Sequence, residues 1–246
     1  PLIVAASLIA SEQLALRAGR SPDGVAGHSV GELAALVGAE VLDAEDAMRL
    51  VGVRGRAMAD AAAQTPTGMS AVLRGDAGEV LALLEELDLT PANYNVEGQI
   101  VAAGTLAALA ALAEKAPQGV RVMPLQVAGA FHTSYMSSAV ETLRDAVAEV
   151  DPQDPTVTLW SNRDGSVVTS GQDALDRIVT QVSSPVRWDL CMESFLAAGV
   201  SGFIELAPAG ALVGLAKRGL RGVPNVAVKT PEDLDAAVAL LNGEAK

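Results

Sequence analysis

A serine stands at the centre of the segment from Gly27 to Gly31, which reads GHSVG. The pattern Gly-x-Ser-x-Gly is typical of a nucleophile elbow, in which a sharp turn between a strand and a helix exposes the serine hydroxyl. Apolar residues before the segment favour a strand, and the run from Glu32 to Leu36 after it favours a helix. This context predicts that Ser29 is a nucleophile, and a surface serine in a glycine-rich turn is the alternative.

A serine nucleophile needs a base, and histidine is the usual one because its ordinary pKa lies near neutrality. The sequence has two histidines, His28 and His132. His28 directly precedes Ser29, and neighbouring side chains at the end of a strand point in opposite directions. We therefore expect His132 to be the base, and a capping or core histidine is the alternative interpretation of that residue.

The position of His132 also bears on the kind of enzyme. In ordinary α/β-hydrolases the triad runs serine, acid, histidine, with the histidine late in the chain. No histidine follows His132 in this sequence. This order argues against an esterase of the usual plan, and it indicates that something other than a carboxylate orients the imidazole.

Hydrophobic periodicity predicts alternating helices and strands around these residues. In the first part we expect helices over 1–18, 30–40 and 44–63 and a short strand over 24–27. In the last part we expect strands over 156–160, 202–206 and 226–229, with helices over 174–182, 187–198, 211–219 and 232–241. This alternation is typical of an α/β fold.

The stretch between Thr65 and Ala128 has a different order of elements. We expect a strand over 69–73, a helix over 79–87, two short strands around 95–98, a helix over 106–116 and a strand over 120–126. The order β-α-β-β-α-β is that of the ferredoxin-like, or split βαβ, arrangement. The sequence therefore predicts a large α/β domain of residues 1–65 and 129–246, with a ferredoxin-like subdomain of residues 66–128 inserted in it.

Charge and composition exclude several classes of function. The chain has 17 Lys and Arg residues against 30 Asp and Glu, a net charge of −13, so it lacks the basic footprint of a nucleic-acid-binding surface. Its single cysteine, Cys191, and two histidines cannot build a Cys/His zinc site or an internal disulfide. No apolar run approaches the roughly 20 residues of a spanning helix, and no signal peptide is evident. We expect no metal, no nucleic-acid or membrane partner, and a cytoplasmic location.

Several segments together resemble the malonyl-CoA:acyl carrier protein transacylase family, particularly its actinobacterial form. The resemblance covers essentially the whole chain and is carried by residues 27–32 (GHSVGE), 129–133 (GAFHT), 181–189, 93–104, 160–162 and 211–218. The family fold is an α/β-hydrolase-like large domain with a ferredoxin-like insert. The pattern of predicted elements agrees with that fold.

The resemblance implies a role for each residue of the catalytic site. Ser29 takes the malonyl group as an ester, and His132 is its general base and later its general acid. Gln181 matches the glutamine whose main-chain carbonyl holds the histidine in place of a triad acid. The N–H of Val30 supplies one donor of the oxyanion hole.

The resemblance also implies two residues that select the substrate. Arg54 matches the arginine that binds the free carboxylate of malonyl, and a guanidinium suits this role because it offers two charge-assisted hydrogen bonds. Arg56, two positions along the same predicted helix, points to a different face. Phe131 matches malonyl-selective members, whose methylmalonyl-selective relatives carry a smaller residue there, so we expect a preference for malonyl. The alternative is that the Phe131 ring simply packs its loop.

The sequence departs from the family at its start. Members begin with a strand and a Gly-Gln-Gly-type loop, one of whose backbone N–H groups completes the oxyanion hole, and no such segment precedes Pro1. We therefore expect the N-terminal strand of the large domain to be missing from this sequence, with Val30 as the remaining donor of the hole.

The leading hypothesis is an acyltransferase that moves malonyl from malonyl-CoA to the phosphopantetheine thiol of acyl carrier protein, in fatty acid or polyketide biosynthesis. It needs no cofactor, because the coenzyme A thioester is its substrate. Carrier proteins of this family context are acidic, so docking would rely on a local basic patch. Lys217, Arg218 and Arg221 are the candidates for that patch, and a solvated helix end is the alternative.

Three other functions stay open at this point. One is an acyltransferase unit of a modular polyketide synthase. Another is a serine esterase or thioesterase, which the missing triad acid and Arg54 disfavour. The third is a non-catalytic, carrier-binding module.

Overall fold

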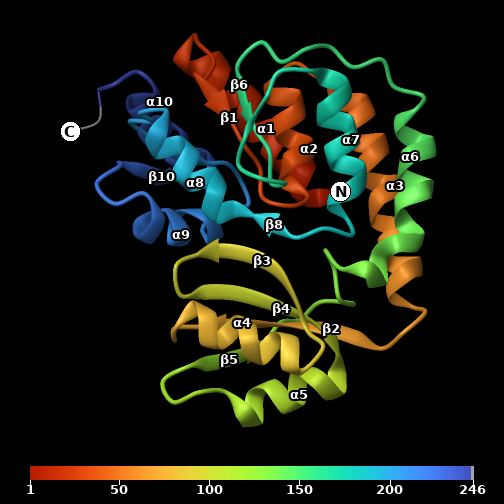
Figure 1. Ribbon diagram of the computed structural model, residues 1–246. Helices are drawn as coiled ribbons and strands as arrows, with labels where there is room; N and C mark the ends of the chain where they lie inside the picture. Colours follow the sequence, from red (N-terminus) through yellow and green to blue (C-terminus); the bar gives the residue numbers. More distant parts are fainter. Residues whose placement is uncertain (245–246) are drawn as a thin grey trace.

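The structure is a computed structural model that describes residues 1–244 and alternates helices with strands (Figure 1). Its upper part in Figure 1 is formed first by α1 (Leu2–Ala18), β1 (Gly24–Val25), α2 (Gly31–Gly38), α3 (Ala44–Ala62), α6 (Ser137–Val147), β6 (Thr158–Trp160), β7 (Val167–Val168) and α7 (Gly171–Gln181). It is completed by α8 (Trp188–Ala197), β9 (Phe203–Glu205), α9 (Ala211–Gly219), β10 (Asn225–Ala227) and α10 (Leu234–Leu241). Short 3₁₀ helices precede α6 at Ser134–Met136 and α10 at Pro231–Asp233.

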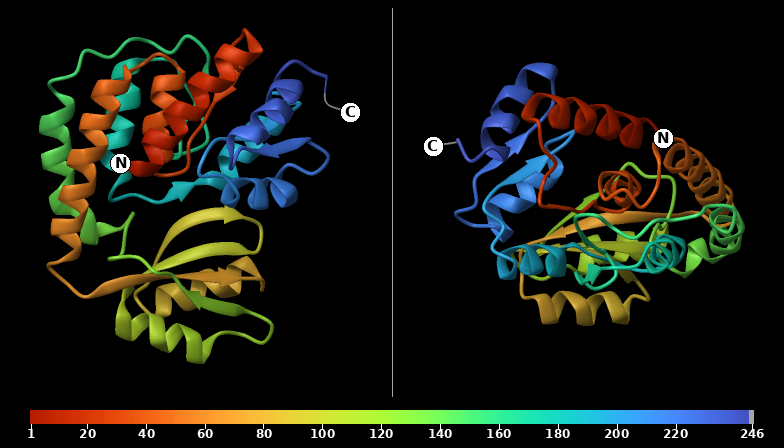
Figure 2. Two further views of the ribbon diagram at one scale, coloured as in Figure 1. Left: turned by 180° about the vertical axis from the view of Figure 1, so that it is seen from behind. Right: turned by 90° about the horizontal axis from the view of Figure 1, so that it is seen from above.

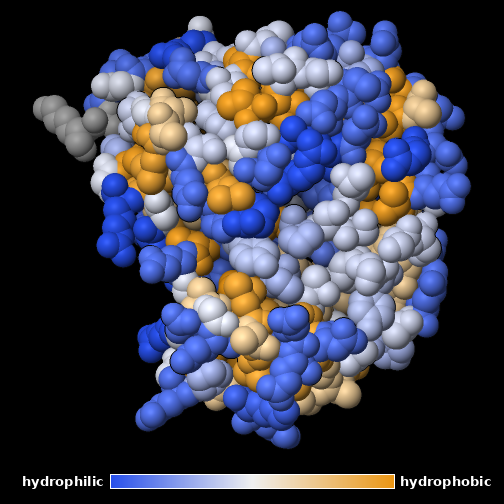
Figure 3. Space-filling model, in the orientation of Figure 1, coloured by the Kyte–Doolittle hydropathy of each residue, from blue (hydrophilic) through white to orange (hydrophobic). Residues whose placement is uncertain are grey.

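The lower part in Figure 1 is formed by one continuous stretch of the chain. Its elements are β2 (Thr67–Leu73), α4 (Ala77–Glu86), β3 (Thr90–Val96), β4 (Gln99–Thr105), α5 (Leu106–Lys115) and β5 (Arg121–Pro124). Figure 3 shows an indentation of the molecular surface on the left, between the upper and the lower parts. The element order is the β-α-β-β-α-β order that the sequence predicts.

The strands of residues 1–244 form three sheets. In the upper part, β1 pairs with β6 in parallel and β6 with β7 antiparallel, while β9 and β10 form a separate parallel pair. The lower sheet has the order β5-β2-β4-β3-β8. Its last strand, β8 (Val186–Arg187), comes from the later part of the chain and pairs in parallel with β3, so a strand from outside residues 66–128 extends this sheet.

The helices of the upper part bury a shared apolar core. Leu33 of α2, Leu50 of α3, Leu143 of α6 and Leu175 of α7 are all almost completely buried in it. A second apolar cluster contains Trp188 and Phe195 of α8, Leu215 of α9 and Trp160 of β6. In the right-hand view of Figure 2, from above, α1 runs along the upper edge of the picture, beside α10. Its Ala10 and Leu14 pack against residues of α10.

The local sequence explains why α3 carries a buried arginine. Asp43 caps the helix, because its side chain accepts a hydrogen bond from the N–H of Asp46. The buried residues of α3 recur at helical spacing and form one inward stripe: Ala47, Leu50, Val51, Arg54, Ala57, Met58 and Ala61. Arg54 therefore stands in the middle of an apolar stripe, and its guanidinium must meet polar partners inside the protein.

One helix is missing from the sequence-based prediction. The prediction assigns no helix or strand between residues 129 and 155, whereas α6 forms there. Its buried residues, Ala139, Leu143 and Val147, recur every four positions, which is a helical signal. Val140 and Ala146 lie beside this stripe and also pack against the core, so the helical spacing is present in the sequence, and the helix is stabilised by packing against α3 and α7.

Candidate active site

The turn that carries Ser29 joins β1 to α2 in a conformation that few residues adopt. Ser29 has φ +54°, in the left-handed region that is costly for a residue with a side chain. A Cβ atom at Gly27 would lie 2.0 Å from the carbonyl carbon of Gly31, so only glycine fits at position 27. A Cβ at Gly31 would meet no atom within 4 Å. Close packing thus excludes any side chain at the first glycine of the motif, whereas there is room for one at the second.

The Ser29 hydroxyl lies against His132. The distance from Ser29 Oγ to His132 Nε2 is 2.7 Å, although the two residues are 103 positions apart in sequence. His132 lies in the loop between β5 and the 3₁₀ helix before α6, and it too has a left-handed backbone, with φ +63°. Its N–H donates to the carbonyl of Val182 at 3.0 Å, which ties this loop to the end of α7.

The imidazole of His132 is held by a main-chain acceptor. Its Nδ1–H donates to the carbonyl oxygen of Gln181 at 2.8 Å. With the proton on Nδ1, Nε2 is free to accept the hydrogen bond from the Ser29 hydroxyl. Burial is the main cause that lowers the pKa of His132 to about 3, and the nearby charge of Arg54 lowers the pKa further. The imidazole is therefore neutral at pH 7 and able to take a proton.

Arg54 contacts the same hydroxyl. Its Nη2 donates to Ser29 Oγ at 3.2 Å and to Gln181 Oε1 at 3.2 Å. Burial lowers the pKa of Arg54 to about 10, which leaves the guanidinium charged at neutral pH. Arg56 is exposed. Of the two neighbouring arginines, Arg54 is the one that lies at the candidate site.

Val30 and Phe131 flank the serine and the histidine in sequence. Within residues 1–244 the N–H of Val30, at the start of α2, has no hydrogen-bond acceptor, so it is available to an oxyanion. Phe131 is half-buried and packs between the core of the upper part and the cluster that contains Met69 and Ala92. The ring therefore packs its loop, and its role in selecting a substrate stays a prediction.

His28 has a separate set of partners. Its Nε2 lies 2.9 Å from Oδ1 of Asn95 on β3, and its ring packs against Trp188 in a T-shaped arrangement with the ring centroids 5.6 Å apart. Burial lowers the pKa of His28. This histidine therefore connects the serine turn to the lower part of the molecule, and within residues 1–244 the hydroxyl of Ser29 contacts His132 and Arg54 instead.

Comparison with known proteins identifies the family. Residues 3–234 match the acyl transferase domain family. The malonyl CoA-acyl carrier protein transacylase of Mycolicibacterium smegmatis is 53% identical over 240 residues, which are 96% of this chain and 83% of that protein. The chain belongs to the malonyl-CoA:acyl carrier protein transacylase family. The transacylase of Mycobacterium tuberculosis strain H37Rv is 55% identical over 238 residues, 96% of this chain and 78% of that protein.

Solved structures of other transacylases have the same fold. The crystal structure of the transacylase MCAT from M. tuberculosis superposes with a TM-score of 0.93 at 54% identity, covering 97% of this chain and 80% of that one. A malonyl-transacylase in complex with the acyl carrier protein of a type II polyketide synthase superposes with a TM-score of 0.90 at 30% identity, covering 96% of this chain and 78% of that one. The α/β fold expected from the sequence is confirmed.

Three polar side chains at this transacylase site were not foreseen from the sequence. Asn162 accepts from the N–H of Ser29 at 2.7 Å through its Oδ1. The side chain of Gln181 donates to the carbonyl of Ser29 at 3.1 Å, in addition to the main-chain role that the resemblance implies. Glu32 is buried and contacts both of these residues. Polar residues just after the end of a strand, as Ser161 and Asn162 are after β6, are a signal for a site.

The residues proposed for docking lie on the surface near α9. Lys217 and Arg218 stand in the last turn of α9, Arg221 follows the helix, and all three are exposed. Arg218 Nη2 also contacts Oε1 of Gln99 on β4. The patch therefore borders both the upper and the lower parts, and its use as a docking surface stays a prediction.

The described part of the chain lacks two kinds of feature. Within residues 1–244, no three His, Cys, Asp or Glu side chains gather in a way that would hold a metal ion. In the same part of the chain, no helix has both the length and the apolar character needed to cross a membrane.

Proposed function

We propose that this transacylase moves a malonyl group from malonyl-CoA to the phosphopantetheine thiol of acyl carrier protein, through an ester on Ser29. One observation carries the proposal: the hydroxyl of Ser29 lies between His132 Nε2, at 2.7 Å, and Arg54 Nη2, at 3.2 Å. The nucleophile thus contacts both a base and a cation that could bind a carboxylate. The relatives and neighbours named above are malonyl transacylases, which supports the same reaction.

In the first half-reaction, Ser29 Oγ attacks the thioester carbonyl carbon of malonyl-CoA while His132 Nε2 takes the hydroxyl proton. The carbonyl oxygen becomes an oxyanion, toward which the N–H of Val30 is available. When the tetrahedral intermediate collapses, the C–S bond breaks and His132 returns the proton to the departing coenzyme A sulfur. The products are malonyl-Ser29 and free coenzyme A.

The second half-reaction reverses these steps with a different thiol. His132 takes the proton of the phosphopantetheine thiol, and the sulfur attacks the ester carbonyl of malonyl-Ser29. Collapse of the intermediate breaks the C–O bond, and the proton passes from His132 to Ser29 Oγ. The enzyme is restored and the carrier bears the malonyl thioester.

Arg54 would bind the free carboxylate of the malonyl group. The guanidinium is buried and charged, and its polar partners in the structure are the Ser29 hydroxyl and the Gln181 amide oxygen. A malonyl carboxylate offers a stronger, charged acceptor than either. An esterase has no use for such a cation beside its nucleophile, so Arg54 favours malonyl transfer over simple ester hydrolysis.

The finer description of the fold belongs to the same proposal. We assign residues 1–65 and 129–246 to an α/β-hydrolase-like domain and residues 66–128 to a ferredoxin-like insert. The sheet order β5-β2-β4-β3 with antiparallel pairing of neighbours supports the ferredoxin-like assignment. A reaction without a cofactor and a cytoplasmic location stay predictions.

The experiment that tests the function follows the fate of the acyl group. The protein is incubated with malonyl-CoA carrying a ¹⁴C label in the malonyl group, freed of excess substrate, and divided between buffer and holo acyl carrier protein. We expect a labelled protein that is stable in buffer and transfers its label to the carrier. Discharge to water at the same rate with and without carrier would identify a hydrolase instead, and the absence of label would indicate a non-catalytic module.

A further inference from the structure

The peptide of Ser29 is held at both ends by side chains. Its N–H donates to Oδ1 of Asn162 at 2.7 Å, and its carbonyl accepts from Nε2 of Gln181 at 3.1 Å. Asn162 also donates from its Nδ2 to the carbonyl of Gly27 at 2.7 Å. Because Ser29 has a left-handed backbone, these bonds oppose its relaxation toward an ordinary conformation.

Glu32, in the first turn of α2, contacts both residues, Asn162 through its main chain and Gln181 through its side chain. Glu32 Oε1 accepts from the main-chain N–H of Asn162 at 2.5 Å, and Glu32 Oε2 accepts from Nε2 of Gln181. Each carboxylate oxygen therefore has one donor. The carboxylate connects Asn162, just after β6, to Gln181, the last residue of α7. Glu32 is only 5% exposed, so no solvent competes for these bonds.

The two neighbouring donors require that both terminal atoms of the residue 32 side chain be hydrogen-bond acceptors. Gln181 uses its Oε1 to accept from Arg54 and its Nε2 to donate to Ser29 and Glu32. An amide at position 32 would turn an NH₂ group toward either the Asn162 N–H or the Gln181 NH₂, and two donors would face each other. A flip of the Gln181 amide would only move that conflict to Arg54.

We propose that Glu32 is a positioning residue for acyl transfer. Its ionised carboxylate fixes Asn162 and Gln181, which hold the Ser29 peptide so that the hydroxyl faces His132. Through Gln181 it also directs the amide oxygen that orients Arg54. This inference rests on the proposed function, because the reaction it serves is the formation of malonyl-Ser29.

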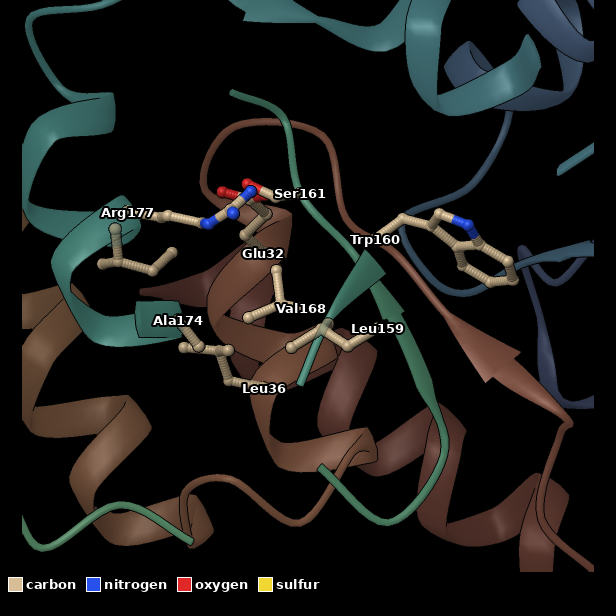
Figure 4. Close-up of a pocket in the computed structure, with 9 residues that line it drawn as sticks. Glu32, Leu36, Leu159, Trp160, Ser161, Val168, Ala174 and Arg177 are labelled. Atoms are coloured by element: carbon tan, nitrogen blue, oxygen red, sulfur yellow. The ribbon is translucent and has the colours of Figure 1, made fainter. Parts of the chain in front are cut away.

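The charges around Glu32 support this role. Burial is the main cause that raises the pKa of Glu32 to about 7, and the bonds from Asn162 and Gln181 oppose that rise. The surrounding titratable and charged groups are Arg54 on α3, Arg177 on α7, Cys191 on α8 and the partners of Arg177, Asp164 and Asp173. Glu32, Ser161 and Arg177 line one cavity of about 10 Å³ (Figure 4). Protonation of Glu32 would create the same conflict between donors as an amide does.

The test measures how fast Ser29 is acylated, with no carrier protein present. The rate constant for malonyl-Ser29 formation and the Kd of malonyl-CoA are determined by rapid quench for the wild type and for Glu32→Gln. We expect the rate constant to fall on the order of 10²-fold, since a small displacement of a nucleophile has an effect of that size. The Kd should change less than the rate constant, because Glu32 reaches the carboxylate-binding Arg54 only indirectly, through Gln181.

The pH profile separates positioning from general stability. We expect the wild-type acylation rate to fall as the pH drops through about 7, where Glu32 takes up a proton. His132, with a pKa of about 3, would cause a loss only at far lower pH. The Glu32→Gln variant should be slow and lack the fall near neutrality. The wild-type profile needs no variant to fold. Because burial raises the pKa of Glu32 above its ordinary 4.5, a rate that stays flat down to about pH 4.5 would by itself overturn the proposal.

Glu205→Gln is the matched control. Glu205 is also a buried carboxylate, and it accepts from the main-chain N–H groups of Gly210, Leu212 and Val213 at the start of α9, away from Ser29. Its substitution should lower the melting temperature and leave acylation and its pH profile like those of the wild type. An equal loss of acylation in both variants, or wild-type acylation in Glu32→Gln, would overturn the positioning role.

A double-mutant cycle tests the route of the effect. If Glu32 acts through Gln181, the loss in Glu32→Gln/Gln181→Ala should be smaller than the product of the two single losses. Fully multiplicative losses would overturn that route. A wild-type protein that forms no malonyl-Ser29 at all would refute the proposed function itself, whereas normal wild-type acylation with an unaffected Glu32→Gln variant would refute only this inference.

Discussion

The Nδ1–H of His132 donates to the main-chain carbonyl of Gln181 across 2.8 Å. The bond does the orienting work that a carboxylate does in a serine-histidine-aspartate triad, since it fixes the tautomer and the ring. A carbonyl brings no negative charge. The acceptor therefore does not repel an anionic malonyl group bound next to it.

This bond predicts how Gln181→Ala differs from His132→Ala. Alanine at position 181 keeps the carbonyl acceptor but loses the side-chain bonds to Ser29, Glu32 and Arg54. We expect malonyl-Ser29 formation to slow on the order of 10-fold, because the net effect of such bonds is about 1 kcal/mol. His132→Ala should slow it about 10² to 10⁴-fold, because the base is lost. Equal losses in single-turnover acylation would contradict the orienting role of the carbonyl.

Arg54 predicts a change of acyl preference. In Arg54→Ala we expect malonyl transfer to fall far more than acetyl transfer, because only malonyl presents a carboxylate to the lost guanidinium. The measurement is kcat/KM for both thioesters. Arg56→Ala is the control, since that side chain is exposed, and it should keep the malonyl preference. Parallel losses for the two acyl groups in Arg54→Ala would refute carboxylate binding by this residue.

Phe131 predicts a limit on the size of the acyl group. If its ring leaves no room for a 2-methyl group, Phe131→Ala should raise the kcat/KM of methylmalonyl-CoA relative to malonyl-CoA. One methylene-sized clash supports a change of about 10 to 200-fold. The ring also packs against two apolar clusters, so thermal unfolding of the variant must be followed in parallel. An unchanged ratio in a folded variant would assign Phe131 to packing alone.

Much of the fold followed from the sequence, and the failures have physical reasons. The buried stripe of α3 is long and strongly periodic, so its prediction over 44–63 matched Ala44–Ala62. The helix α6 was missed although its apolar residues recur at helical spacing, because it is only 11 residues long, against 19 for α3, and more than half of its residues are polar. The strand β8 has two residues, and it forms only because β3 offers an edge to pair with, which no local pattern records.

The candidate site was predicted in outline but not in its supporting contacts. The spacing around Ser29 and the small number of histidines pointed to His132, and the two side chains do meet. The family resemblance was needed for Arg54 and Gln181. The contacts of Glu32 with Asn162 and Gln181 span 130 and 149 positions in sequence. Neither spacing nor periodicity can predict such long-range bonds.

The buried histidine predicts a specific pH dependence of stability. The pKa of His132 is about 3 in the folded protein against an ordinary 6.5, so between these values only the unfolded chain binds the proton. The free energy of unfolding should therefore fall as the pH drops from about 6.5, by about 1.4 kcal/mol per pH unit from this residue. Glu32, with its pKa raised from 4.5 to about 7, opposes this trend, because the folded state binds its proton more tightly.

Unfolding in guanidinium chloride at about pH 7 and pH 5 measures how the free energy of unfolding changes with pH. Between the two values, His132→Gln should lose about 2 kcal/mol less stability than the wild type. Glu32→Gln should lose more than the wild type, because its opposing contribution is gone. Identical pH dependence in the wild type and His132→Gln would mean that His132 ionises normally in the folded protein.

The most direct test of the central claim locates the malonyl group on the chain. The wild type and Ser29→Ala are incubated with malonyl-CoA, quenched in acid, digested, and analysed by tandem mass spectrometry. The account predicts one malonyl group, as an ester on Ser29, in the wild type and no such adduct in Ser29→Ala. A malonyl group on any other residue that is discharged by acyl carrier protein, or an adduct of equal yield in Ser29→Ala, would contradict it.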